Sequence, residues 1–168
     1  MKKEIILLFL FVFIQTFLGA QDIRHSKKDT LVWNAKNAIF FELFGAGGMP
    51  LGYTLNYDRL LHSNGIFRTS VRVGANPYPL AGFFTFPIMV NLLIGKKACF
   101  ELGVGGDLVV DNSNDQKYTG GAFTSVIGFR YQDFNRGLFF RAGLTPTVGG
   151  TNGGFFVSLV GVSLGYSF

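Results

Sequence analysis

The stretch Val160-Gly161-Val162-Ser163-Leu164-Gly165-Tyr166-Ser167-Phe168 alternates without a break between large apolar residues and small ones. A period of two places the large residues on one face of a β-strand and the small residues on the other. A soluble strand usually carries charge on its second face, but here that face has neither charge nor bulk. The pattern is typical of a membrane barrel, with bulky residues toward lipid and small ones toward a crowded interior.

The same alternation recurs along the chain and divides it into eight segments. The predicted strands are residues 38–46, 51–60, 66–75, 83–94, 98–110, 118–131, 138–145 and 155–168. A transmembrane strand needs about 9–11 residues, and eight is the smallest even strand number among bacterial single-chain barrels. The sequence therefore predicts an all-β fold, an eight-stranded antiparallel up-and-down transmembrane β-barrel.

Two stretches complicate this division. Pro87 lies inside the fourth segment, where it cannot donate a ladder hydrogen bond, so we expect a bulge or local bend there. The glycine-rich stretch Thr147–Gly154 is interpreted as a loop. A transmembrane helix over Leu80–Gly95 is a weaker alternative, because Thr85, Pro87 and Asn91 interrupt the apolar run.

The beginning of the chain has the features of a secretory signal peptide. Lys2 and Lys3 precede the apolar run Ile5–Ile14, and the small residues Gly19 and Ala20 follow it. The run is short for a membrane span, which needs about 20 residues, so an uncleaved anchor is the less favoured alternative. The expected organisation is a signal peptide at 1–20, a periplasmic leader at 21–37 and the barrel at 38–168.

The charges indicate which face meets lipid. An eight-stranded soluble barrel of the lipocalin type has the same period with its faces exchanged, but its exterior would need many charged residues. The few charges of this chain have both signs and fall on the face of the small residues, where buried charges must be paired. We therefore predict an enclosed network of Glu42, Asp58, Arg68, Arg72, Glu101, Arg130 and Arg141.

The hairpin around Ser63 predicts a specific pairing within this network. A turn centred on Ser63 would place Asp58 opposite Arg68 and Thr54 opposite Arg72. Opposite charges that face each other across two strands stabilise a sheet by roughly 0.2–1 kcal/mol.

The remaining charge and the single cysteine exclude other classes of protein. When Lys2, Lys3 and Glu4 are removed with the signal peptide, 13 of the 15 Lys and Arg residues and 9 of the 10 Asp and Glu residues remain, which leaves an excess of positive charge. This excess is scattered, whereas nucleic-acid binding needs a clustered basic stripe, so no nucleic-acid partner is expected. Cys99 is the only cysteine, so it forms no disulfide within the chain and is expected to be a small packed residue.

Strand number also predicts orientation. The two ends of an even-stranded barrel lie on the same side, which in bacterial barrels is the periplasm. The turns expected on that side are 61–65, 95–98 and 132–137, and the connections expected to face outward are 45–50, 76–82, 111–117 and 146–154. The outward connections are mostly longer, as in known outer-membrane barrels.

No group of residues predicts catalysis or metal binding. His25 belongs to the leader, and His62 beside Ser63 in a turn does not form a hydrolase triad without further converging groups. No pair of histidines and no cysteine cluster has the spacing of metal ligands. Gly95-Lys96-Lys97 lacks the surrounding residues of a phosphate loop. We expect no catalytic residue, no metal and no cofactor.

With these features the chain resembles the small OmpA/OmpX-type outer-membrane β-barrel proteins of Gram-negative bacteria. The hairpin from Phe41 to Arg59 also resembles the opening of many uncharacterised outer-membrane barrels. The resemblance implies a monomer in the outer membrane, surrounded by membrane lipid and lipopolysaccharide. It also implies a C-terminal signal that the barrel assembly machinery reads, formed by Val162, Leu164, Tyr166 and Phe168.

Location is easier to predict than activity. The prediction is a small, non-enzymatic integral barrel with a structural, envelope-integrity or surface-interaction role. A wide, porin-like diffusion pore is not expected, because eight strands leave no aqueous channel. The alternatives are a lipid-modifying barrel enzyme, such as a lipid A acyltransferase or deacylase, and a soluble lipocalin-like periplasmic protein that binds an apolar ligand.

Overall fold

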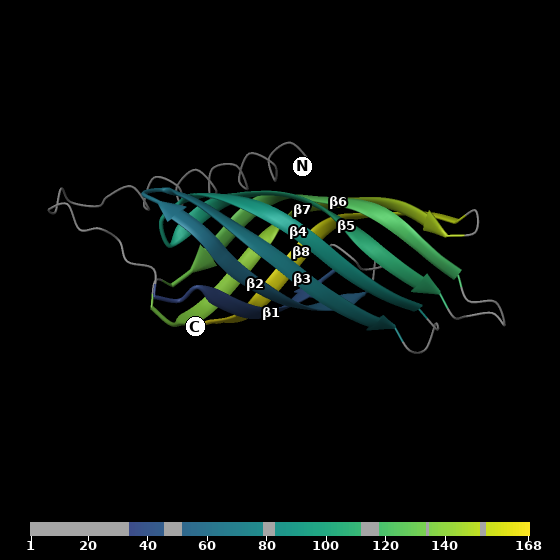
Figure 1. Ribbon diagram of the computed structural model, residues 1–168, viewed down its shortest axis with the longest axis horizontal. Helices are drawn as coiled ribbons and strands as arrows, with labels where there is room; N and C mark the ends of the chain where they lie inside the picture. Colours follow the sequence, from purple (N-terminus) through teal and green to yellow (C-terminus); the bar gives the residue numbers. More distant parts are fainter. Residues whose placement is uncertain (1–33, 46–51, 79–82, 112–117, 134, 152–153) are drawn as a thin grey trace, which may run out of the picture. The chain divides into compact units, whose positions relative to one another are not determined.

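The computed structural model describes residues 34–45, 52–78, 83–111, 118–133, 135–151 and 154–168, which form eight antiparallel strands closed into a barrel (Figure 1). Each strand pairs with the next in sequence, and the last pairs with the first. The predicted all-β, up-and-down, eight-stranded fold is confirmed. The strands are β1 (Asn37–Leu43), β2 (Tyr53–Asn64), β3 (Phe67–Tyr78), β4 (Phe83–Gly95), β5 (Ala98–Asp111), β6 (Tyr118–Gln132), β7 (Gly137–Thr151) and β8 (Gly154–Ser167).

The predicted bounds hold within one residue for β4, β5, β6 and β8, and they fail where local geometry outweighs composition. β1 stops at Leu43, three residues earlier than expected, because Phe44 has a φ of 63° in the left-handed region. β2 continues to Asn64, and the chain turns at Gly65, whose φ is 59°. The turn predicted at 61–65 therefore lies at 65–66.

The prediction of a loop over Thr147–Gly154 is wrong for the first part of this stretch, because β7 continues to Thr151. Gly149 pairs with Ala122 of β6 and with Phe156 of β8. A side chain at Gly149 would overlap the Cβ of Ala122, so glycine here allows two backbones to approach closely. Pro146 lies where the β7–β8 register shifts, between Leu144 and Thr147.

A bulge or local bend was expected at Pro87, and the described residues of β4 show no bulge there. The β4–β5 register runs unbroken through Pro87, which lies opposite Asp107. On its other side the β3–β4 pairing skips Gly74 and Ala75 and resumes in the same register. A Cβ at Gly74 would lie 2.9 Å from Cγ of Pro87. The missing donor of proline is thus accommodated by a gap in the ladder rather than by an extra residue.

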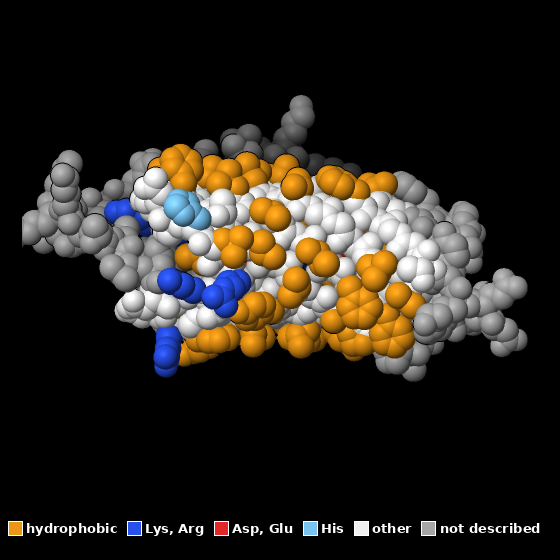
Figure 2. Space-filling model, viewed as in Figure 1, with side chains coloured by type: hydrophobic (Ala, Val, Ile, Leu, Met, Phe, Trp, Pro, Cys, Tyr) orange, Lys and Arg blue, Asp and Glu red, His pale blue; other side chains and the backbone are white. Residues whose placement is uncertain are grey.

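The two faces of the sheet are inverted relative to a soluble protein. Exposed large apolar side chains occur on all eight strands, and Leu55 and Leu164 are 52% and 59% exposed. Figure 2 shows such side chains distributed along the visible face of the barrel. Charged side chains such as Arg72 and Glu101 are instead buried inside. Among the described residues, no helix is long and apolar enough to cross a membrane.

The start of β1 and the end of β8 lie at the same end of the barrel as the short β2–β3, β4–β5 and β6–β7 turns. We call this the terminal end. The backbone amide of Asn37 donates to the carbonyl of Phe168 at 3.0 Å, which closes the barrel beside the C-terminus (Figure 1). The β2–β3 turn contacts the β4–β5 turn, since Gly95 N donates to Ile66 O at 2.8 Å. Backbone and side-chain contacts also link the β6–β7 turn to this end, including Asn34 to Asn135 at 3.0 Å.

Candidate functional site: an enclosed ring of charges

The seven charged residues predicted to share the interior all lie inside the barrel, each no more than 1% exposed. Strand alternation places them there, because each has the parity of the small or hydroxyl residues of its strand. They are Glu42 on β1, Asp58 on β2, Arg68 and Arg72 on β3, Glu101 on β5, Arg130 on β6 and Arg141 on β7. Because an unpaired buried charge is costly, the partners of these residues define the site.

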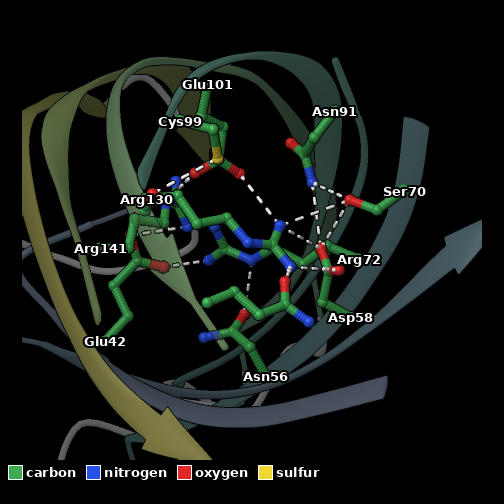
Figure 3. Close-up of polar contacts among 11 residues, drawn as sticks. Glu42, Asn56, Asp58, Ser70, Arg72, Asn91, Cys99, Glu101, Arg130 and Arg141 are labelled. Carbon is green, nitrogen blue, oxygen red and sulfur yellow. Dashed lines mark hydrogen bonds and ion pairs between the residues drawn. The ribbon is translucent and has the colours of Figure 1, made fainter. Parts of the chain in front are cut away.

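Six of the seven form a chain of alternating sign around the interior, shown in Figure 3. We call these six the charge ring, and in order they are Arg72, Glu42, Arg141, Glu101, Arg130 and Asp58. Glu42 accepts from Nη2 of Arg72 with one oxygen, and its other oxygen lies 3.5 Å from Nη1 of Arg141. Arg141 then reaches Glu101, with its Nε 3.0 Å from Oε2.

Arg130 completes the charge ring by bridging two carboxylates. Its Nη1 lies 3.6 Å from Oε1 of Glu101. Toward Asp58 it makes two contacts, from Nη2 to Oδ1 at 2.7 Å and from Nη1 to Oδ2 at 3.2 Å, the bidentate geometry that strengthens an arginine–carboxylate pair. Asp58 lies directly opposite Arg72 in the β2–β3 register, so the chain returns to the strand beside its start. Three guanidinium groups balance three carboxylates.

Neutral polar side chains satisfy further groups of the charge ring. Oδ2 of Asp58 accepts from Ser70 at 2.9 Å and from Asn91 at 3.3 Å. Nε of Arg72 donates to Oδ1 of Asn56 at 2.8 Å. These three neutral residues were not among the predicted site residues, although the strand period places Asn56 and Ser70 on the polar face of β2 and β3.

An aromatic pair supports the charge ring toward the terminal end. The rings of Phe40 and Phe139 are stacked, with centroids 4.4 Å apart. The guanidinium of Arg72 lies 5.3 Å from the centroid of Phe40, and that of Arg130 lies 4.7 Å from the centroid of Phe139. Such cation–π contacts are favourable when desolvated. The two arginines are thereby held by carboxylates on one side and by aromatic faces on another.

A row of glycines makes room for these large side chains. In the strand registers Glu101 faces Gly128, Gly128 faces Gly143, and Gly143 faces Gly161. A Cβ at Gly161 would lie 2.6 Å from Oε1 of Glu42. Since an eight-stranded barrel is just wide enough for its own side chains, residues without side chains are needed beside Arg and Glu.

Arg68 lies apart from the charge ring, and its predicted pairing with Asp58 is wrong. The β2–β3 register places Arg68 opposite Ser63 and Asp58 opposite Arg72. The turn lies at Gly65 rather than at Ser63, and a register shift between Leu60 and His62 adds a residue to β2. Both changes shift the β2–β3 register, so that Asp58 lies opposite Arg72 rather than opposite Arg68.

Arg68 donates instead to backbone carbonyls of the neighbouring turn. Its Nη2 donates to the carbonyl of Lys96 at 2.7 Å and of Gly95 at 3.4 Å. The pairing of Thr54 with Arg72 is also wrong, because Arg72 lies opposite Asp58 in the β2–β3 register.

Asp107 is a further buried carboxylate, and it was not among the predicted interior charges. It is 3% exposed and lies on β5 six residues after Glu101. An even separation within one strand places both residues on the same face. The signal was therefore present in the period of β5, although Gly103, Gly105 and Gly106 between the two carboxylates hide it.

The other residues singled out from the sequence lie outside the charge ring. Cys99 is buried among Leu60 and Leu93 at the terminal end, and its thiol donates to the carbonyl of Arg130 at 3.3 Å. His62 is exposed near the end of β2. The residues of the predicted C-terminal signal are exposed on the outer face of β8 and directly after its end: Val162, Leu164, Tyr166 and Phe168.

Some predictions fall outside the part of the chain that the structure describes. These are the signal peptide at 1–20, most of the leader including His25, and most of the predicted outward connections. Within the described residues, no three His, Cys, Asp or Glu side chains are grouped in a way that could hold a metal ion.

The charge ring can act as an electrostatic cross-link, because it joins side chains from β1, β2, β3, β5, β6 and β7. A comparison with models of protein families, a search of curated proteins and a search of solved structures each found no match.

Proposed function

We propose that the chain is a small integral β-barrel of the outer membrane with a structural, envelope-integrity or surface-interaction role and no catalytic activity. The observation that carries this proposal is the inversion of the two faces. Apolar side chains such as Leu55 and Leu164 are exposed, while Glu42, Arg72 and Arg130 are buried. This arrangement suits hydrocarbon outside and a sealed polar interior.

The closed backbone supports the same proposal. Hydrocarbon offers no partner for an unpaired amide or carbonyl group, so only helices and closed barrels can span a bilayer. Here β1 pairs with β8 from Ala38 opposite Ser167 to Leu43 opposite Val162. In water, an apolar exterior that extends over all eight strands would be an unusually large exposed patch.

The interior argues for this reading over a lipocalin-like binder. A barrel that holds an apolar ligand needs an apolar cavity, but the middle of this barrel holds the charge ring and its polar partners. The resemblance to OmpA/OmpX-type proteins and the predicted signal peptide and C-terminal signal support an outer-membrane location. We infer a monomer in contact with membrane lipid and lipopolysaccharide, delivered by the barrel assembly machinery.

Extraction of the native protein from cells tests the proposal. Membranes are washed with alkaline carbonate and with high salt, and the protein is followed by immunoblot beside a known outer-membrane barrel and a soluble periplasmic protein. We expect the protein to stay in the membrane pellet. We also expect unheated samples to migrate differently from boiled ones on a gel, because a folded barrel resists detergent. Release into the carbonate or salt wash would exclude an integral barrel.

The absence of catalysis has its own test. Lipid A from a strain lacking the gene is compared by mass spectrometry with lipid A from the parent strain and from the complemented strain. We expect identical acylation in all three. A change in acyl chains that complementation restores would favour the lipid-modifying enzyme instead.

A further inference from the structure

The cations outside the barrel interior are gathered at one end. Among the described residues, every Lys and Arg that is not buried lies at the terminal end, and we call this set the basic rim: Lys36, Arg59, Lys96, Lys97 and Arg136. On the face drawn in Figure 2, the Lys and Arg side chains gather toward the end of the barrel that holds the C-terminus in Figure 1.

The basic rim is assembled by separate parts of the fold. Lys36 directly precedes β1, and its carbonyl accepts from the amide of Leu60 at 2.7 Å. Arg59 faces outward on β2, opposite Asn37 at the start of β1. Lys96 lies in the β4–β5 turn and Arg136 in the β6–β7 turn. Closure of the barrel brings these separated positions to one perimeter.

Negative charge hardly offsets the basic rim. Among the described residues whose side chains can be placed, Asp133 is the only Asp or Glu outside the interior. It is bound to Lys97, with Nζ 3.0 Å from Oδ2. Lys36, Arg59, Lys96 and Arg136 therefore leave an excess of positive charge around this end.

Amphipathic aromatic residues border the basic rim on the side of the apolar exterior. Tyr57 lies two residues before Arg59 on the same face of β2, and its hydroxyl donates to Oδ1 of Asn37 at 2.7 Å. Tyr166 and Phe168 are exposed next to β1. Tyr at the boundary of an apolar band is typical of the headgroup level of a membrane, which sets the basic rim at the height of lipid phosphates.

We propose that the basic rim binds the phosphates of anionic phospholipids in the leaflet at the terminal end, an inference that rests on the proposed membrane location. Lys and Arg side chains can extend past the apolar boundary and place their charge among headgroups. Charge complementarity and the adjoining aromatic residues favour this occupant over a protein partner. The barrel would thus select the lipids around it at one end.

Lipid selectivity tests the inference. The purified protein is reconstituted in phosphatidylcholine vesicles with spin-labelled phosphatidylcholine or spin-labelled phosphatidylglycerol, and electron spin resonance measures the motionally restricted lipid next to the protein. The test variant combines Lys36→Gln, Lys96→Gln and Arg136→Gln, which leaves the Lys97–Asp133 pair intact. Lys36→Arg, Lys96→Arg and Arg136→Lys form the charge-conserving control, and Lys117→Gln removes a cation from the β5–β6 connection.

We expect the wild type, the charge-conserving control and Lys117→Gln to prefer phosphatidylglycerol. Because each cation attracts anionic headgroups, neutralising three should lower the relative association constant for phosphatidylglycerol to near one, the value that marks no preference, and added salt should weaken the preference of the wild type. Equal restriction of both lipids by the wild type, or an unchanged preference in the test variant, would overturn the inference. A wild type that selects added lipopolysaccharide and not phosphatidylglycerol would also overturn it.

The two proposals fail in different ways. If the membrane location is wrong, the protein will not float with the vesicles and neither labelled lipid will be restricted. If only the present inference is wrong, the protein will float and restrict both lipids equally.

Discussion

At the scale of single residues, Arg130 has the most partners in the charge ring. It contacts Asp58, Glu101 and the ring of Phe139, and its Nη2 also donates to Gln132 at 2.8 Å. These partners belong to different strands, so Arg130 fixes their separation across the interior. Arginine suits this position because its planar guanidinium can serve two carboxylates at once.

Loss of the contacts of Arg130 should destabilise the folded barrel strongly. We expect Arg130→Met to lower the free energy of unfolding by about 3–5 kcal/mol, because it leaves buried carboxylates without their cation. The matched control is Arg136→Met on the exposed basic rim, which should change stability by no more than about 0.5 kcal/mol. Equilibrium unfolding in urea, in phosphatidylcholine vesicles, measures both. Equal losses for the two variants would contradict the role of Arg130.

The contact between Asp58 and Arg130 can be tested by a double-mutant cycle. Asp58→Asn and Arg130→Met should each destabilise the barrel, and the double variant should lose about 0.5–3 kcal/mol less than the sum of the two. Strict additivity would indicate that the two side chains do not interact in the folded barrel.

The glycines beside the charge ring give a second test at residue scale. A Cβ at Gly143 would lie 2.7 Å from Cα of Gly128 and 2.7 Å from the carbonyl oxygen of Ile127, whereas at Gly121 the nearest atom is 3.8 Å away. Gly143→Ala should therefore destabilise the barrel by about 1–3 kcal/mol through overpacking, and Gly121→Ala should be tolerated. Melting followed by gel mobility compares the two, and similar melting temperatures would contradict the close packing.

At the scale of elements, the sequence predicted which segments are strands better than how they pair. Alternation identified all eight strands because one face is apolar throughout. It could not locate the turn of the β2–β3 hairpin, since Ser63, Asn64 and Gly65 all suit a turn. It also misread the end of β7, where proline and glycine usually mark loops but here serve a register shift and a close backbone approach.

Closure of the sheet can be tested by a cross-link between its first and last strands. Phe41 and Leu164 are exposed and directly opposite in the β1–β8 register. Paired Cα atoms of antiparallel strands are about 4.5–5.5 Å apart, which suits a disulfide. In a Cys99→Ala background, Phe41→Cys with Leu164→Cys should therefore form a bond under mild oxidation.

The control for this cross-link shifts one partner along the same strand. Val160 lies four residues before Leu164, roughly 13 Å along β8. Phe41→Cys with Val160→Cys should remain reduced, as judged by the mobility of the unfolded chain on non-reducing gels. Equal cross-linking of both pairs would indicate an open or sliding seam.

The filled interior of the barrel predicts a lack of permeability. The charge ring, the stacked Phe40–Phe139 pair and the cluster of Leu60, Leu93 and Cys99 are all buried inside the barrel. In a liposome-swelling assay we expect no uptake of small sugars above that of empty vesicles, with a wide porin as the positive control. Swelling that depends on sugar size would show a continuous aqueous path.

The charge ring was also only partly predictable from the sequence. The period of each strand places its members inside, because Glu42 or Arg141 on the outer face would interrupt an apolar row. The sequence of a single strand does not determine which of these charges pair with one another. Glu42 meets Arg141 from β7 and Glu101 meets Arg141 across β6, so the pairing depends on the offset that accumulates around the closed sheet. Asp58 was accordingly matched with the wrong arginine.

On the proposed membrane location, the route of the charge ring across the β1–β8 seam has a consequence for insertion into a bilayer. Glu42 on β1 depends on Arg72 from one side of the seam and on Arg141 from the other. A sheet still unrolled in oil would carry a half-neutralised carboxylate and two bare hydrogen-bonding edges, both strongly unfavourable there. Closure of the sheet and its transfer from water into the bilayer should therefore occur in one concerted step, because Glu42 is fully neutralised only when β1 and β8 meet.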